Sequence, residues 1–222
     1  GPPARDFLTR PSIVVDNIAN LLGVPRDSML DGYMWYFVLV LAYLIALFPV
    51  LMVMRLRSEE TSGRAEAVQS TALTRVRWAA GHLVVAALGT AALLALAALA
   101  FTTVYALLLG GFAGTAPRFL AAALSEAPAA WCVGALCLAA YGLLPRASVP
   151  LCWAVWILTA GLGQVVAPFY GVWGGTPFEP FHYVPNTVAG QPYGVVPAAA
   201  LLALTALLTA AGLLALRRRD FG

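Results

Sequence analysis

The chain has 222 residues, of which 61% are apolar and only 10% are charged, and its formal net charge is +3. Soluble domains carry about 25% charged residues, so this composition excludes an ordinary soluble protein, and so small a charge does not indicate nucleic-acid binding. All 13 basic residues are arginine. A phosphate-binding P-loop needs a lysine, so this sequence cannot contain one. Any ATP that drives the protein must therefore be hydrolysed by another chain.

Residues 1–32 are of mixed character and are expected to lie outside the membrane. The first long apolar run then begins with Tyr33, Trp35 and Tyr36, which are aromatic residues that favour the membrane–water interface. Apolar runs of about 20 residues can cross a bilayer as helices. The sequence therefore predicts an all-α polytopic membrane protein with five transmembrane helices within residues 33–222. The expected spans are 33–54, 79–109, 127–144, 147–168 and 194–216.

A dense charged segment, Arg55 to Glu66, separates the first two spans. It holds three acidic residues and three arginines, and its pairs Arg55–Glu59 and Glu60–Arg64 have the i,i+4 spacing that stabilises a helix. A solvated loop that only fixes membrane topology would need arginines but no carboxylates. The acidic residues therefore favour a docking site for a cytoplasmic partner over such a loop.

The distribution of arginine predicts the orientation of the chain. If the charged segment is cytoplasmic, the inner segments hold nine arginines and the outer segments four. The C-terminus is then cytoplasmic, and residues 1–32, 110–126 and 169–192 are extracytoplasmic. A chain that begins outside should follow a further transmembrane helix, so we expect a fragment or one half of a larger protein.

The outer loop before the last span is rich in glycine, proline and aromatic residues. This composition suits a partly buried re-entrant segment that forms an outer gate, and an interfacial aromatic belt is the alternative. The residues expected at the gate are Tyr170, Trp173, Phe178, Phe181 and Tyr183.

Few other polar side chains lie near the expected spans. Glu126 is a candidate for binding substrate or a proton, although a glutamate at a span end is more simply explained by solvation. For His82, which has no second histidine nearby, a hydrogen-bonded structural role is expected. The three cysteines are expected to be buried as small hydrophobic side chains. The sequence predicts no catalytic residues and no metal site.

The charged segment also resembles a known family. Arg57-Ser58-Glu59-Glu60-Thr61-Ser62-Gly63-Arg64-Ala65-Glu66, followed by Arg75-Val76-Arg77-Trp78, is similar to a signature of ABC-2-type permeases, in particular the actinobacterial polyketide-antibiotic exporters. Arg218-Arg219-Asp220-Phe221 resembles the ending of that family. The resemblance covers about residues 33–222 and implies the C-terminal half of a permease, a six-helix unit that here lacks its first helix.

The resemblance implies an ABC transporter permease in the plasma membrane that exports hydrophobic or amphipathic small molecules, such as antibiotics. Its implied partners are an ATP-binding subunit, a second permease half or second copy, and the lipid bilayer. ATP and magnesium would bind to the ATP-binding subunit, so no cofactor is expected in this chain. Residues 58–74 would be the coupling helix; the residues expected to contact the ATPase are Arg57, Glu59, Glu60, Gly63, Arg64, Glu66, Arg75 and Arg77.

Two alternatives stay open at this point. A membrane-embedded lipid-modifying enzyme would need clustered polar groups, for which only Glu126, Glu179 and His182 are available on the outer side. A non-transporting assembly subunit would need no such groups.

Overall fold

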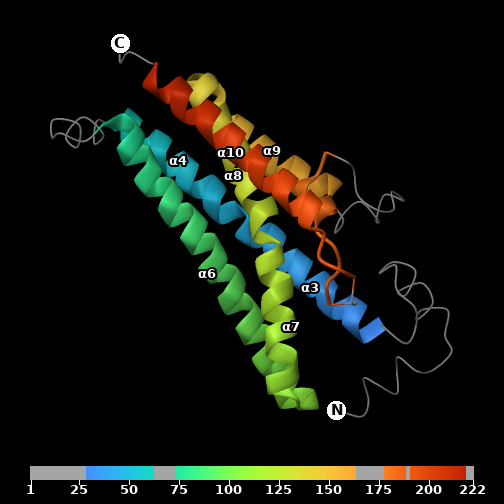
Figure 1. Ribbon diagram of the computed structural model, residues 1–222. Helices are drawn as coiled ribbons and strands as arrows, with labels where there is room; N and C mark the ends of the chain where they lie inside the picture. Colours follow the sequence, from blue (N-terminus) through green and yellow to red (C-terminus); the bar gives the residue numbers. More distant parts are fainter. Residues whose placement is uncertain (1–28, 63–73, 164–177, 189–190, 219–222) are drawn as a thin grey trace.

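The computed structural model describes residues 29–62, 74–163, 178–188 and 191–218. These residues form a bundle of long α-helices with two short 3-10 turns, and no strand occurs among them. Figure 1 shows α6 as one uninterrupted rod, while α3 with α4 and α7 with α8 form two further rods. The bounds are α3 (Met29–Ile45), α4 (Leu47–Thr61), α6 (Arg75–Leu109), α7 (Phe112–Ser125), α8 (Ala127–Leu143), η2 (Pro145–Ala147), α9 (Ser148–Leu162), η4 (Pro180–Tyr183) and α10 (Val195–Arg217).

Four helical stretches are long and apolar enough to cross a membrane. They carry many large apolar side chains on the outside of the bundle, among them Leu88, Leu107 and Val196. The chain is therefore an all-α polytopic membrane protein, as its composition predicts. Helix α9 is shorter, with 15 residues, and the span expected over residues 147–168 continues beyond the described residues. The four stretches are Met34–Thr61, Arg75–Leu107, Phe112–Leu143 and Val195–Arg217.

Two of the rods are interrupted just before a proline. Pro49 has no N–H to donate to the carbonyl one turn earlier, and α3 gives way to α4 at Ala46. Pro128 acts in the same way, and α7 gives way to α8 at Glu126. Helix α7 and the span expected over residues 127–144 are consequently one bent rod, which Figure 1 shows running through α7 and α8.

Helix α8 is the centre of the bundle, because 13 of its 17 residues are buried. Small residues let its neighbours come close. A Cβ atom added at Gly142 would lie 2.6 Å from the carbonyl oxygen of Gly212 on α10, and one added at Gly134 would lie 2.7 Å from the Cβ atom of Pro49 on α4. These close approaches at glycine fix where α4 and α10 cross α8.

The three cysteines are free and buried, as expected. The Cys137 thiol lies 3.9 Å from the carbonyl oxygen of Cys152, and the Cys152 thiol lies 3.9 Å from that of Cys137. The two side chains therefore join α8 to α9 without a disulfide.

Candidate functional site

The candidate residues gather at two places in the bundle, and an apolar cavity lies in another part of it. The first place is the charged end, where α4 stops and α6 and α10 have their polar termini (Figure 1). The second is the joint between α7 and α8, which is covered by the segment of residues 178–188.

At the charged end, Glu59 joins α4 to α6. Its carboxylate accepts a hydrogen bond from Arg55 Nε at 3.1 Å and lies 3.3 Å from His82 Nε2. The Nδ1 atom of His82 lies 3.3 Å from the carbonyl oxygen of Trp78. Both ring nitrogens thus face acceptors, and both hydrogen bonds can form only when the ring carries two protons.

Glu60 joins the same end of α4 to α8. Its Oε2 atom accepts a hydrogen bond of 2.5 Å from the hydroxyl of Tyr141, which is fully buried. Leu56, also fully buried, packs into the core one turn earlier on α4. The end of α4 is therefore fixed to two other helices, because the Glu59 carboxylate contacts α6 and the Glu60 carboxylate contacts α8.

The other residues expected to contact an ATPase lie around this link. Arg57 is half-buried. Arg75 and Arg77 lie in the first turn of α6, where the Thr74 side chain accepts a hydrogen bond from the Arg77 N–H at 3.4 Å and caps the helix. Ser58, Thr61 and Ser62 are exposed. Gly63, Arg64 and Glu66, with most of the expected coupling helix, lie outside the described residues.

The residues expected at an outer gate differ in how far their side chains are exposed. Tyr170 and Trp173 lie outside the described residues. Phe178 is 93% exposed and Tyr183 is also exposed, whereas Phe181 is fully buried. Only Phe181 of the three described residues therefore packs into the core.

Glu126 is buried, with 1% of its surface exposed, so the expectation that it is solvated is wrong. The reason is that α7 continues into α8 without a loop at the surface, and Glu126 lies at the joint between them. Glu179 is 2% exposed and lies near Glu126, so the two carboxylates repel each other when both are charged. No sequence motif reveals that these two residues are neighbours.

Glu179 holds the 178–188 segment against α3. Its Oε1 atom accepts a hydrogen bond from the hydroxyl of Tyr43 at 2.7 Å and another from the Phe181 N–H at 2.9 Å. The rings of Tyr43 and Phe181 pack with their centroids 4.3 Å apart. Burial raises the pKa of Glu179, which lies outside the four long spans, to about 7, although these hydrogen bonds act to lower it.

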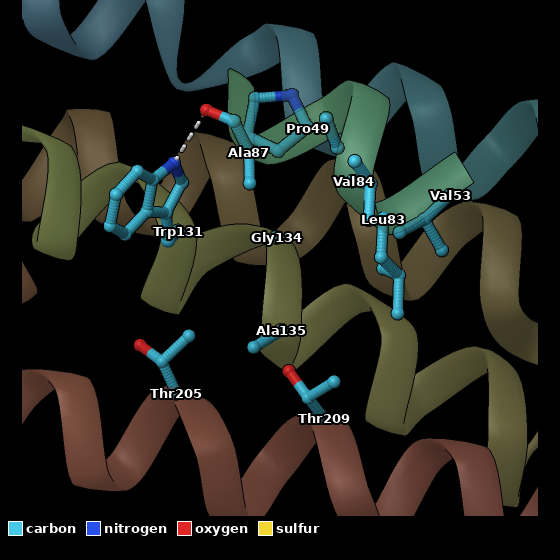
Figure 2. Close-up of a pocket in the computed structure, with 11 residues that line it drawn as sticks. Pro49, Val53, Leu83, Val84, Ala87, Trp131, Gly134, Ala135, Thr205 and Thr209 are labelled. Carbon is cyan, nitrogen blue, oxygen red and sulfur yellow. Dashed lines mark hydrogen bonds between the residues drawn. The ribbon is translucent and has the colours of Figure 1, made fainter. Parts of the chain in front are cut away.

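An apolar cavity of about 280 Å³ lies between α4, α6, α8 and α10 (Figure 2). The indole N–H of Trp131 donates to the carbonyl oxygen of Ala87 at 3.2 Å, and the Thr205 hydroxyl donates to that of Leu201 at 2.8 Å. These donors are thus satisfied within the chain. The walls, which include Val53, suit an apolar group more than a polar one.

Residues 3–217 match the family model described as the C-terminal domain of the multidrug efflux system permease Rv1217c. The chain belongs to this permease family. It is 33% identical over 180 residues to the multidrug efflux system permease protein Rv1217c of Mycobacterium tuberculosis (strain ATCC 25618 / H37Rv), and the alignment covers 79% of this chain and 32% of that relative. The resemblance to the C-terminal part of a permease is thereby confirmed.

The link between Glu60 and Tyr141 should stabilise the bundle. A hydrogen bond to a charged group contributes about 1.5–3 kcal/mol, and Tyr141→Phe leaves the Glu60 carboxylate without this donor. We expect Tyr141→Phe to lower the free energy of unfolding by about 1–3 kcal/mol in detergent titrations.

Tyr105→Phe is the matched control, since the Tyr105 ring packs on Phe119 elsewhere in the bundle. Equal stability of Tyr141→Phe and the wild type would show that the link contributes nothing.

Proposed function

We propose that this chain is the C-terminal membrane domain of a permease in an ATP-driven exporter of lipophilic or amphipathic small molecules. The observation that carries the proposal is the family match over residues 3–217, together with a relative named as a multidrug efflux permease. The chain spans 32% of that relative, and in this proposal further permease segments complete the transporter. The chain acts in this proposal as a transport subunit and not as an enzyme.

A separate ATP-binding subunit would supply the energy. The chain contains no lysine, so the lysine of a phosphate-binding loop has to come from a partner. The excess of arginine near the ends of α4 and α10 favours a cytoplasmic location for the charged end. In this orientation the C-terminus is cytoplasmic, in a plasma-membrane protein, and the joint between α7 and α8 lies toward the outer side.

The contacts at the charged end support a mechanism of coupling. The exposed residues Ser58, Thr61 and Ser62 offer a surface to the ATPase, while Glu59 and Glu60 on the same helix contact α6 and α8. A push on this surface would reach three helices together, because the links run across helices and not along one. Glu59 and Glu60 thus transmit motion inside the permease, and the exposed residues receive it.

Reversing the two charges tests this mechanism. We expect Glu59→Lys with Glu60→Lys to reduce cargo-stimulated ATP hydrolysis at least about tenfold in proteoliposomes that contain the full permease and its ATP-binding subunit. The physical reason is the loss of both links, since even one lost link of about 1.4 kcal/mol corresponds to a factor of ten.

Arg146→Glu is the control, because it reverses an exposed charge in η2 outside these links. Stimulated hydrolysis at the wild-type level in a folded double variant would contradict the coupling mechanism.

The apolar cavity supports a cargo that is at least partly apolar. We propose that it holds an apolar group of the cargo during transport, because its walls are mostly apolar and the polar groups of Trp131 and Thr205 are already hydrogen-bonded. Ala135, a buried residue of α8, lines this cavity, and Figure 2 shows its position between Gly134 and Thr209.

The larger side chain of Ala135→Leu should occupy part of the cavity. We expect it to raise the cargo concentration that gives half-maximal ATPase stimulation by several-fold. The reason is that one methylene group changes binding in an apolar pocket by about 1–3 kcal/mol. Ala199→Leu, on the exposed side of α10, adds the same atoms outside the cavity. An unchanged half-maximal concentration in Ala135→Leu would remove the cavity from the transport route.

A further inference from the structure

Two buried carboxyl groups meet where the 178–188 segment covers the joint between α7 and α8. Glu126 belongs to the joint and Glu179 to the segment, and both are almost completely buried. Their charges are near enough to repel each other. Two like charges in such a place are unfavourable unless something neutralises one of them.

Each carboxyl group has one oxygen that still lacks a partner. The Oε2 atoms of Glu126 and Glu179 are buried, and neither accepts a hydrogen bond within the part of the chain that the structure describes. Glu179 Oε1 differs, because Tyr43 and Phe181 both donate to it. Two charged carboxylates buried together cost several kcal/mol, so the arrangement favours the binding of a positively charged ligand.

The surroundings restrict the nature of this ligand. Among the described residues, no group of three or more His, Cys, Asp or Glu side chains could hold a metal ion. An organic cation needs space, yet both Oε2 atoms are occluded and the apolar cavity lies elsewhere, between α4, α6, α8 and α10. A proton needs neither, since it binds directly to a carboxylate oxygen and removes that charge.

Two other titratable or charged side chains contact the segment from the elements around it, Tyr43 on α3 and Arg118 on α7. The segment itself carries His182 and Tyr183, and both are exposed. Arg118 donates to the carbonyl oxygen of Val188 at 2.8 Å. Tyr43 and Arg118 thus hold the two ends of the same segment.

We propose that Glu126 and Glu179 together bind a proton, and that this proton keeps the 178–188 segment closed over the joint between α7 and α8. In the closed state one carboxyl group is protonated, so the pair carries a single negative charge. When the proton leaves to water, two carboxylates repel each other and the segment moves away until water reaches them. The inference depends on this site alone and not on the proposed export function.

The pKa of Glu179 gives the direction and size of the pH effect. Burial raises this pKa to about 7, whereas a solvated glutamate has a pKa of about 4.3. A raised pKa in the closed state stabilises that state at low pH, and the stabilisation is lost as the pH rises through the raised value. With these two values, the ratio of open to closed segment rises about tenfold from about pH 6 to about pH 8.

Labelling of introduced cysteines measures this opening. Val188 is 1% exposed at the end of the segment, and Val195 is 72% exposed at the start of α10. In the full chain in lipid nanodiscs, we expect the maleimide labelling rate of Val188→Cys, divided by that of Val195→Cys, to rise about tenfold from about pH 6 to about pH 8. The exposed site corrects for ionisation of the thiol itself.

Removing both carboxyl groups is the decisive comparison. Glu126→Gln with Glu179→Gln, added to each cysteine variant, should make the labelling ratio independent of pH, because neutral amides cannot repel as charges do. If this double variant does not fold, infrared spectra of the wild-type chain take its place. They should show a protonated carboxyl band at about pH 6 that is lost by about pH 8.

Three results would overturn the inference. One is a wild-type labelling ratio that stays constant over this pH range. Another is an infrared spectrum without a carboxyl band that titrates there. The third is a ratio that follows sodium concentration at constant pH, since the pair would then bind a metal cation and not a proton.

Discussion

Buried polar side chains in this bundle depend on partners from other helices, because the interior of a bilayer offers no water in their place. Among the described residues, contacts between two polar side chains that join different elements include Glu59 with His82, Glu60 with Tyr141, and Glu179 with Tyr43. The rod made of α3 and α4 takes part in each of these three pairs. It therefore connects the charged end of the bundle to the segment that covers the other polar site.

Helix α8 gives a second connection between these places. Glu126 precedes its first residue and Tyr141 lies in its last turn, about 22 Å apart along the axis. Because α8 is buried along most of its length and lies close to α4 and α10 at its glycines, it can move only together with them. In the proposed transporter, motion at the charged end would thus be felt at the proton-binding pair.

The sequence predicts the membrane class and the main helices well, because long apolar runs and arginine-rich ends are local signals. The charged segment around Glu59 and Glu60 likewise indicates the permease family from its residues alone. The burial of Glu126 and its approach to Glu179 could not be predicted in this way. They depend on α7 continuing into α8 and on a contact between Tyr43 and Glu179, which are 136 residues apart. The apolar cavity has no motif either, since small and apolar residues from four helices form it.

The central claim is that the end of α4 meets an ATP-binding subunit. A photoreactive residue at Ser58, which is exposed at this end, tests it directly in the purified complex of the full permease with that subunit. The account predicts a crosslink from Ser58 to the ATP-binding subunit and none from Leu107, which is exposed near the far end of α6. A crosslink from Leu107 with none from Ser58 would contradict it.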